Sequence, residues 1–180
     1  ACVSHELKTP IAIIQGYAQG LMENVANEED RNFYCDVIVE ESYKMDSLVK
    51  ELLLISQIES GYFKMNMEKT NIYHLIKEII DKYSSKTVKI EYEDKEDINV
   101  LCDEKYIDRV LDNLISNAIK YRTGESSIKV KVEDKKNRCM VTVSNESENL
   151  KEKDLETIWT PFVRLDSAIG KEGHGLGLSI

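Results

Sequence analysis

Three residues near the start of the chain, His5, Glu6 and Thr9, could carry out nucleophilic chemistry. An imidazole nitrogen is a nucleophile near neutral pH, and the neighbouring carboxylate of Glu6 can take or return the proton on the other ring nitrogen. Thr9 follows His5 by four residues, so both side chains lie on one face of a helix. Pro10 removes the N–H that would bond to the carbonyl of Glu6, and we expect a bend just below the histidine. The group predicts a nucleophilic imidazole on a helix that is easily deformed.

A second group of polar residues lies on the stretch 103–121, whose amphipathic pattern and acidic start predict a helix. Asn113 and Asn117 are four residues apart and share a face of that helix, although asparagine has only a modest preference for helix interiors. Lys120 and Tyr121 follow with a cation and an aromatic ring. Solvent exposure would explain an isolated pair of asparagines, but these neighbours favour a binding site.

Gly173, Gly175 and Gly177 occupy alternate positions late in the sequence. Glycine leaves backbone N–H groups uncovered and permits positive φ, and such a loop before a helix can cradle phosphate groups. A flexible linker is the alternative interpretation of the same residues. Arg164 and Lys171, in the same part of the sequence, are candidate phosphate contacts or ordinary solvated cations.

The elements that must position these groups fall into two halves with different periodicities. In residues 3–62 apolar side chains recur at intervals of three and four, which predicts two helices packed as an antiparallel hairpin around a polar turn at 24–29. The seam consists of Leu7, Ile11, Ile14, Ala18, Leu21, Ile38, Met45, Leu48, Leu52 and Ile55, with Glu41 interrupting it. One hairpin cannot bury such a seam, so we expect two copies to form a dimeric four-helix bundle. Packing of the hairpin against the second half of its own chain is the alternative.

The second half of the chain mixes helices with strands. We predict helices at 70–83 and 103–121. Strands are predicted at 88–92, 98–101, 128–132 and 140–143, the last two joined by a hairpin turn at 134–137. The predicted fold class is therefore an α plus α/β sandwich: a helical hairpin in residues 1–63, then a mixed β-sheet layer covered by helices in residues 64–180.

The composition excludes several other functions. The chain of 180 residues has a net charge of −9, so it lacks the basic surface of a nucleic-acid-binding protein. No apolar run is long enough to cross a bilayer, and we expect no membrane contact by these residues. Four scattered cysteines without a Cys-x-x-Cys pair fit reduced thiols better than disulfides or a zinc site. Because the sequence starts without methionine and stops just after the glycine-rich stretch, we expect a piece of a longer protein.

Four stretches together resemble the motifs of bacterial sensor histidine kinases. The heptapeptide Ser4-His-Glu-Leu-Lys-Thr-Pro10 resembles their phosphoacceptor box, and residues 112–121 resemble the N box of their ATP-binding domain. Residues 158–164 resemble the F box, and residues 173–180 resemble the glycine-rich G2 box. The resemblance covers nearly the whole chain. It implies a dimerisation hairpin followed by the histidine-kinase-type ATP-binding fold, without the last helix and strands of that fold.

The resemblance also implies a role for each residue of the second group. Asn117 would hold Mg²⁺ through its amide oxygen, and Asn113 would contact the phosphates or the metal shell. Lys120 would offset phosphate charge, and Tyr121 would line the nucleotide. The phosphate-side residues would be Arg164, Lys171, Gly173, Gly175 and Gly177. ATPases of this fold carry a glutamate at the position of Asn113, and because an amide cannot act as a base, the resemblance favours a kinase over an ATPase.

The G1 box departs from the pattern of the family, which is usually Asp-x-Gly-x-Gly. Asn145 replaces the aspartate that accepts a hydrogen bond from the adenine amino group, and Ser147 and Asn149 replace the glycines. An amide oxygen still accepts that bond, but without charge it is a weaker acceptor. Asn149 tolerates left-handed backbone better than Ser147 does. We therefore expect altered adenine affinity or base selectivity.

The resemblance implies that the chain, as a homodimer, uses ATP and Mg²⁺ to phosphorylate His5 and then passes the phosphoryl group to an aspartate on the receiver domain of a response regulator. Thr9 would position a water for the reverse, phosphatase reaction. These residues would lie in the cytoplasm, with the parent protein anchored in the plasma membrane of a bacterium. One rival is a nucleotide-poor phosphatase or scaffold with a degenerate ATP site. The other is an ATPase that uses the hairpin only to dimerise.

Overall fold

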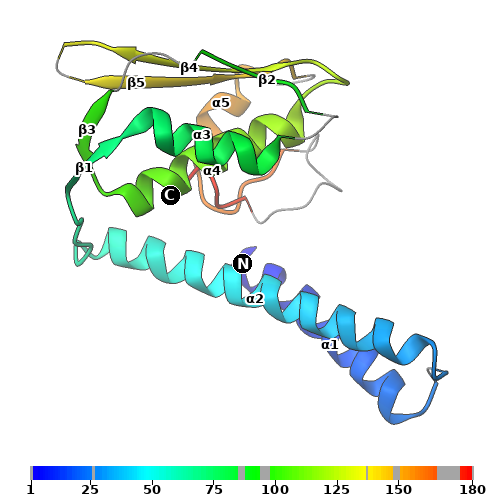
Figure 1. Cartoon of the computed structure of the whole chain (residues 1–180). Helices are drawn as coiled ribbons and strands as arrows, with labels where there is room; N and C mark the ends of the chain where they lie inside the picture. The colour runs from blue at the N-terminus through cyan, green and yellow to red at the C-terminus, as the bar shows by residue number, and fades with distance from the viewer. Residues whose placement is uncertain are drawn as a thin grey trace. The chain divides into compact units, whose positions relative to one another are not determined.

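The computed structural model describes residues 2–25, 27–84, 88–93, 98–136, 138–147, 151–165 and 175–179. The chain divides into two compact units, residues 1–63 and residues 64–180. Figure 1 shows the first unit as a pair of helices and the second as a β-sheet with helices. The predicted fold class, a helical hairpin followed by a mixed sheet covered by helices, is confirmed.

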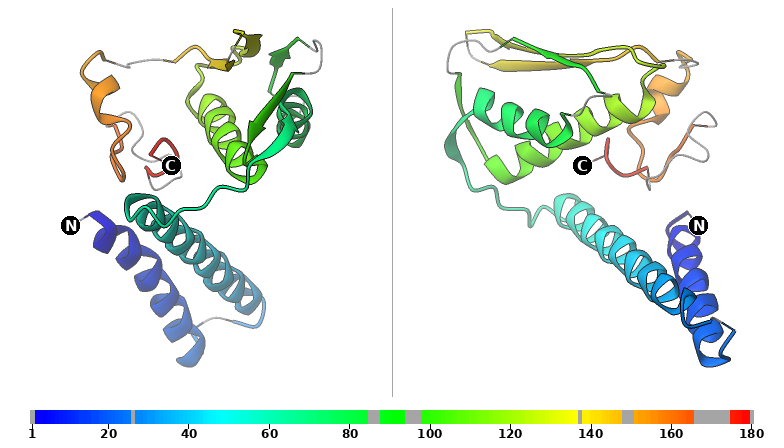
Figure 2. Two further views of the ribbon diagram at one scale, coloured as in Figure 1. Left: turned by 90° about the vertical axis from the view of Figure 1, so that its left-hand side faces the viewer. Right: turned by 45° about the vertical axis from the view of Figure 1, so that its right-hand side comes forward.

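The first unit is an antiparallel hairpin of α1 (Cys2–Met22) and α2 (Asp30–Glu59), which lie side by side in both views of Figure 2. The turn between them sits in the predicted polar segment. There the side chain of Asn27 accepts a hydrogen bond of 2.9 Å from the N–H of Asp30 and so satisfies one free donor at the start of α2. Gly61 follows the end of α2 with φ 71°, a conformation that glycine adopts without a steric penalty.

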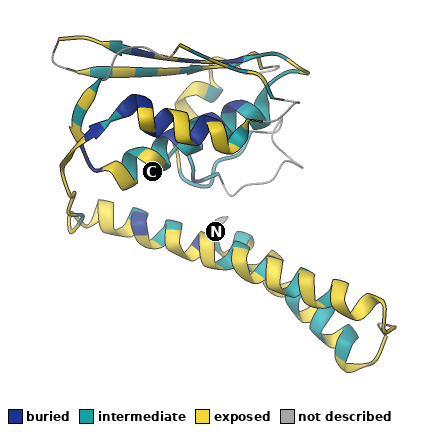
Figure 3. Ribbon diagram, viewed as in Figure 1, coloured by how far each residue is buried: buried dark blue, intermediate teal, exposed yellow. Residues whose placement is uncertain are grey.

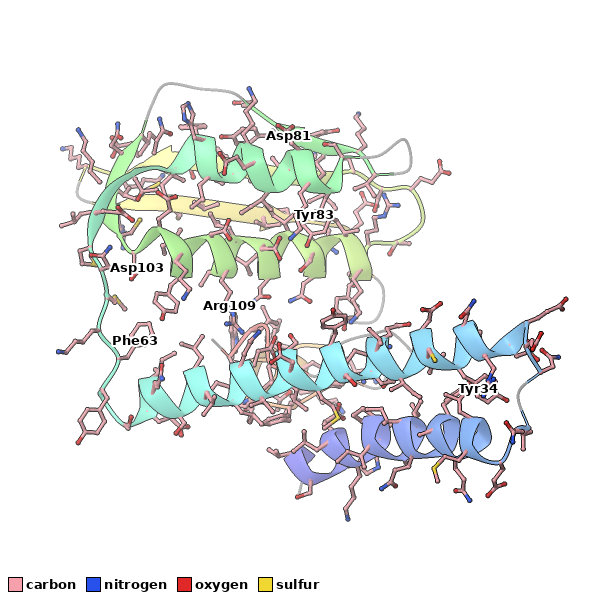
Figure 4. The ribbon with its side chains drawn as sticks, turned by 60° about the horizontal axis from the view of Figure 1, so that its bottom comes forward. Tyr34, Phe63, Asp81, Tyr83, Asp103 and Arg109 are labelled. Carbon is pink, nitrogen blue, oxygen red and sulfur yellow. The ribbon has the colours of Figure 1, made fainter. Side chains whose placement is uncertain are left out.

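Aromatic rings join the two helices near their turn. Tyr17 on α1 makes edge-to-face contacts with Phe33 and Tyr34 on α2, at centroid distances of 6.0 Å and 4.9 Å. Figure 4 shows Tyr34 at this end of the hairpin, close to α1. A Cβ on Gly20 would lie 2.8 Å from Cε2 of Tyr34, so the ring occupies the space that the missing side chain leaves. The close approach of the helices here therefore depends on glycine.

Many residues of α1 and α2 are exposed in a single chain and are drawn yellow in Figure 3, and some of them are large and apolar. The exposed large apolar residues on these helices include Ile11, Phe33, Val39, Tyr43, Val49, Leu53 and Ile58. Within the described ranges, no helix combines the length and apolarity needed to cross a membrane.

The second unit contains five strands and three helices within its described residues. In chain order these are β1 (Glu68–Asn71), α3 (Ile72–Tyr83), β2 (Ile90–Tyr92), β3 (Asn99–Cys102), α4 (Glu104–Tyr121), β4 (Ile128–Asp134), β5 (Cys139–Ser144) and α5 (Asp154–Thr157). One sheet has the order β2-β4-β5, with β2 parallel and β5 antiparallel to β4. β1 and β3 form a separate antiparallel pair. Helices α3 and α4 lie side by side against one face of the three-stranded sheet (Figures 1 and 2).

The core of this unit lies between that sheet and the two helices. The alternating pattern of β4 buries Ile128, Val130 and Val132 on one face. Ile76 of α3 and Ile115 of α4 are fully buried and belong to the same cluster. Burying an isoleucine side chain completely contributes about 1.5–3 kcal/mol relative to leaving it in water. These contacts hold α4 rigidly, which matters because α4 carries the asparagine pair.

Three elements, β1, β2 and α5, differ from the sequence-based expectation. The predicted helix at 70–83 begins at Ile72, because Thr70 and Asn71 belong to β1, which was not predicted. The side chain of Asn71 accepts hydrogen bonds from the N–H groups of Tyr73 and His74, at 3.0 Å and 3.2 Å, and caps the helix. The short helix α5 was also not predicted, and β2 is shorter than the predicted strand at 88–92. All three are short elements whose position depends on tertiary contacts.

Candidate functional site

The histidine of the first group is exposed on α1 near its N-terminal end. Thr9 is also exposed, Glu6 is half-buried, and the hydroxyl of Thr9 donates a hydrogen bond of 3.4 Å to the backbone carbonyl of His5. The predicted shared face of His5 and Thr9 is therefore present. α1 continues as one helix through Pro10, which is buried. The side chain of His5 is therefore accessible from solvent.

The second group is positioned by the cap and core face of α4. Asp103, shown at the start of α4 in Figure 4, is buried, and one of its carboxylate oxygens accepts from the N–H of Tyr106 at 3.4 Å. Its other oxygen accepts from the N–H of Asn66 at 2.7 Å, which fixes the preceding segment to the helix. Leu111, Ile115 and Ala118 form the buried side of α4, and Asn113 and Asn117 are half-buried on another side of the helix. The predicted stripe is present on a helix that is fixed at its start and along its buried side.

The glycine-rich stretch reaches this stripe through one hydrogen bond. The Nδ2 group of Asn113 donates to the carbonyl oxygen of Gly177 at 3.1 Å, across 64 positions of sequence. A Cβ on Gly177 would lie 3.4 Å from Cγ and Oδ1 of Asn113, so the two residues are in direct contact. The structure therefore brings together two of the residue groups that the sequence suggested for nucleotide binding.

Residues 175–179 form a compact turn. Leu176 is 1% exposed and anchors the turn in the interior, and both the N–H and the hydroxyl of Ser179 donate to its carbonyl, at 3.0 Å and 2.8 Å. Gly175 has φ 71°, and its carbonyl accepts from the N–H of Phe162 at 2.9 Å. The turn is thus attached to the segment after α5 as well as to α4.

Leu176 and Phe162 hold the glycine turn in place. Phe162 belongs to the F-box stretch that the sequence indicated, whereas Leu176 was not singled out. Phe162 has φ 64°, an uncommon value for a bulky residue. The sequence around Leu176 does not distinguish it from an ordinary core residue. Trp159, which belongs to the same F-box stretch, is 58% exposed and is not part of the buried core.

Lys120 and Tyr121 stand at the end of α4, with the ammonium group 5.1 Å from the centroid of the tyrosine ring. Both are half-buried. Asn145 follows β5, and its Nδ2 group donates to the backbone carbonyl of Glu146 at 3.3 Å. That same carbonyl accepts from the N–H of Thr123 at 2.8 Å, so the Asn145 segment lies next to the end of α4.

The remaining predicted site residues divide into two sets. Arg164 is half-buried, and its Cγ would lie 3.1 Å from a Cβ on Gly175, so it borders the turn. Lys171 and Gly173 lie outside the described residues. The lid tip that the sequence suggested around residues 168–173 lies outside them as well.

The side chains on α4 offer amide oxygens rather than a ready-made metal cluster. Among the described residues, no group of three or more His, Cys, Asp or Glu side chains is arranged to hold a metal ion. Amide oxygens suit Mg²⁺, which prefers oxygen ligands and usually shares its shell between one or two protein groups, water and substrate phosphates. The donor set of Asn113 and Asn117 therefore fits a magnesium ion that is bound together with a nucleotide.

Two family models match this chain and together define its class. Residues 1–61 match the His Kinase A (phospho-acceptor) domain, and residues 102–180 match the Histidine kinase-, DNA gyrase B-, and HSP90-like ATPase family. A phospho-acceptor domain followed by an ATP-binding domain of this type is the arrangement that the motifs predicted. The chain belongs to the sensor histidine kinases of two-component systems, and the resemblance seen in the sequence is confirmed.

Individual relatives agree with this assignment. The chain is 32% identical to the sensor histidine kinase WalK of Bacillus subtilis over 190 residues, which covers 100% of this chain and 31% of WalK. It is 28% identical to the sensor histidine kinase CssS of the same organism over 182 residues, or 99% of this chain and 39% of CssS. The chain thus spans between about a third and two fifths of the length of these two relatives.

Solved structures show the same fold. The histidine kinase AdeS of Acinetobacter baumannii superposes with a TM-score of 0.72 at 24% identity, over 97% of this chain and 82% of that one. The histidine kinase ThkA, solved in complex with the response regulator protein TrrA, gives a TM-score of 0.68 at 29% identity, over 90% of this chain and 49% of that one.

Proposed function

We propose that this chain binds ATP in its second unit, transfers the γ-phosphoryl group to His5, and passes it on to an aspartate of a response regulator. The observation that carries the proposal is the contact between Asn113 and Gly177, which joins the N-box helix to the glycine turn in a chain that also exposes a histidine on α1. An amide at position 113 supports transfer to a protein nucleophile over hydrolysis, because it cannot deprotonate a water.

His5 is the nucleophile of this proposal. A ring nitrogen attacks the γ-phosphorus, and the N–P bond forms as the bond to the bridging oxygen breaks and ADP leaves with that electron pair. Glu6, the next residue, takes the proton from the other ring nitrogen and leaves a neutral phosphoimidazole. The exposure of His5 supports the second step as well, because a receiver domain must reach the same ring.

The residues of the second unit would bind and orient the nucleotide. Asn117 would supply an amide oxygen to Mg²⁺, which when bound neutralises phosphate charge. Lys120 would offset further charge, and the ring of Tyr121 would lie along the nucleotide. Gly175 and Gly177 would present backbone N–H groups to the phosphates, with Arg164 beside the turn. The predicted roles of Lys171 and Gly173 belong to the same proposal.

The proposed partners are a second copy of the chain and a receiver domain. The uncovered apolar residues of the hairpin supply a surface that a second hairpin could bury in a four-helix bundle. The relative ThkA was solved together with the response regulator protein TrrA, which supports a receiver domain as phosphoryl acceptor. Thr9 would hold a water for dephosphorylation of that partner. Localisation in the cytoplasm, beneath a membrane anchor elsewhere in the parent protein, completes the proposal.

Asn145 favours one second candidate, a phosphatase or scaffold that binds nucleotide poorly. Its Nδ2 group is engaged with Glu146, and its side chain offers adenine a neutral oxygen instead of a carboxylate. A neutral acceptor forms a weaker hydrogen bond than a charged one. Direct measurement of ATP binding by the whole chain distinguishes this candidate, because a scaffold requires no binding at physiological ATP concentrations.

The central test is transfer of label from γ-labelled ATP to the protein. We expect acid-labile, alkali-stable labelling that the substitution His5→Gln abolishes. His74→Gln is the matched control, because His74 is also exposed but lies on α3. Labelling that persists in His5→Gln would disprove the assignment of the nucleophile, and steady phosphate release that survives the same substitution would favour an ATPase.

A further inference from the structure

We propose that Asn113 is a positioning residue, which acts through the carbonyl of Gly177 to set the direction in which the glycine turn presents its next backbone N–H. This inference rests on the proposed nucleotide site and deepens it. The resemblance to the family implied that Asn113 touches phosphates or the metal shell. Its observed partner is instead the backbone of the turn, at 3.1 Å.

The geometry of a peptide unit carries the first step. A peptide bond is planar and trans, so its C=O and its N–H point in opposite directions. Because the carbonyl of Gly177 is directed at the amide of Asn113, the N–H of Leu178 is directed away from that amide. A hydrogen bond on one side of the peptide therefore fixes the donor on the other side. Backbone N–H groups of glycine turns are the groups that recognise anions.

Direct contact between Asn113 and Gly177 makes the orientation of the Gly177–Leu178 peptide depend on these two residues. A Cβ at position 177 would sit 3.4 Å from both Cγ and Oδ1 of Asn113, so the carboxamide lies directly against the glycine. Asn113 itself lies on α4, whose neighbouring Ile115 is fully buried. The position of the carboxamide is therefore set by the rigid core, and the turn takes its orientation from it.

The other attachments of the turn hold its place but not the direction of this peptide. Leu176 is buried and accepts both bonds from Ser179, and Gly175 accepts from Phe162. The bond from the N–H of Ser179 to the carbonyl of Leu176 involves the peptides on either side of the Gly177–Leu178 unit, and the bond to Gly175 lies one peptide earlier. Without Asn113 the closed turn would be less stable and that peptide could rotate, so the N–H of Leu178 would lose its fixed direction.

The experiment uses the whole chain without nucleotide and compares Asn113→Leu with the matched variant Asn117→Leu, one turn along the same stripe. Amide hydrogen exchange is followed by NMR at residues 175–179 and in the core of α4. We expect Asn113→Leu to lower the protection of Ser179, whose N–H bonds to the carbonyl of Leu176 across this peptide, by about three- to tenfold, the contribution of one hydrogen bond. Protection of the α4 core should stay unchanged, and Asn117→Leu should leave the turn unaffected.

Asn113→Asp provides a second variant of nearly identical shape. An ionised carboxylate cannot donate to the carbonyl of Gly177 and repels it, so the loss of protection should exceed that in Asn113→Leu at pH 7 and diminish once the carboxyl is protonated. Exchange that is unchanged in both variants, while their affinity for ATP falls, would overturn the inference and make Asn113 a direct phosphate contact. Equal loss of protection in the α4 core would overturn it as well, since that outcome indicates a merely structural role.

Failure of the proposed function would look different. If the unaltered chain binds no ATP and is never labelled on His5, the proposed kinase reaction is wrong, whatever the exchange of the turn shows. Exchange is measured without nucleotide, so its result stands apart from that outcome.

Discussion

The N–H of Phe162 donates a hydrogen bond of 2.9 Å to the carbonyl of Gly175. This bond joins the segment after α5 to the glycine turn. Both residues have positive φ, 64° and 71°. A Cβ on Gly175 would lie 2.8 Å from the carbonyl oxygen of Val163. The attachment therefore requires glycine at position 175 for two separate reasons, its backbone conformation and the lack of space.

Substitution of this glycine should release the turn from the segment after α5. We expect Gly175→Ala to weaken binding of a fluorescent ATP analogue by about tenfold or more, because positive φ costs about 1–2 kcal/mol for a residue with a side chain and the clash with Val163 adds to it. Gly124→Ala is the control: it has φ 55° but nothing within 4 Å of the added carbon. It should cost about 1–2 kcal/mol of unfolding free energy and leave nucleotide affinity intact. Equal affinities for the two variants would contradict the prediction.

Loss of the amide of Asn117 should affect ligand binding and not folding. The side chain is half-buried and is not one of the buried residues of α4, so Asn117→Ala should leave the unfolding midpoint nearly unchanged. We expect a loss of affinity for ATP with Mg²⁺ of about ten- to a hundredfold, the range for a contact to a charged group, and loss of His5 labelling. Calorimetric titration measures the first, and Ser116→Ala, on the neighbouring position, serves as control. A normal affinity in Asn117→Ala would remove this residue from the site.

Asn145→Asp should strengthen nucleotide binding. It restores a charged acceptor at the position where the family carries aspartate, and charge-assisted hydrogen bonds are roughly twice as strong as neutral ones. We expect a gain of about three- to tenfold for ATP and a smaller change for GTP, which lacks the adenine amino group. Competition of the two nucleotides for a fluorescent analogue measures both. If ATP and GTP gain equally, Asn145 does not face the base.

The two glycines of α1 should respond to alanine in opposite directions. Gly16→Ala should raise the unfolding free energy by about 0.5–1 kcal/mol, because the added carbon meets nothing within 4 Å and alanine is the better helix former. Gly20→Ala gains the same propensity but must displace the ring of Tyr34, which Tyr17 and Phe33 hold in place. Overpacking of this kind costs about 1–3 kcal/mol, so the net effect should be destabilising. Urea unfolding at one fixed protein concentration compares the variants, and equal midpoints would contradict the packing seen around Tyr34.

The carboxyl of Asp108 should oppose folding at neutral pH. Partial burial, and then the nearby charge of Asp112, raise its pKa above the ordinary value of 3.8. A carboxyl whose pKa is raised by folding makes its full contribution to stability at pH values below its pKa in the unfolded chain. That contribution is lost as the pH rises through its pKa in the folded state. Asp108→Asn should therefore raise the unfolding free energy at pH 7, by up to about 0.5 kcal/mol for so exposed a position, and give no gain at pH 3.

The neighbouring aspartate supplies the contrast. Asp112 makes an ion pair of 2.8 Å with Lys82, which joins α3 to α4 and raises the pKa of the lysine. Asp112→Asn should lower the unfolding free energy at pH 7 by about 0.2–1 kcal/mol, the usual worth of an exposed pair. Chemical unfolding at both pH values measures the two variants. A gain in Asp108→Asn that persists at pH 3 would exclude ionisation as its cause.

Short-range patterns in the sequence determined the hairpin, the amphipathic helices and the stripe of asparagines. Apolar spacing of three and four predicts α1, α2, α3 and α4, because a helix buries one face. The alternation of apolar and polar residues in β4 predicts a strand, because successive side chains of a strand point to opposite faces of the sheet. The identity of the class also followed from local motifs, since the phosphoacceptor box and the N box are each contiguous in sequence.

Only the tertiary structure decided which of these pieces meet. β1 has four residues and no apolar alternation, and it exists because β3 supplies its hydrogen-bond partners. Asn113 and Gly177 are 64 positions apart, and Phe162 adopts positive φ for a partner at Gly175. No local pattern encodes such contacts, because they depend on how the chain returns to the same place after folding. The sequence by itself named the chemical groups, while the packing of α4 and the glycine turn assigned Asn113 its partner.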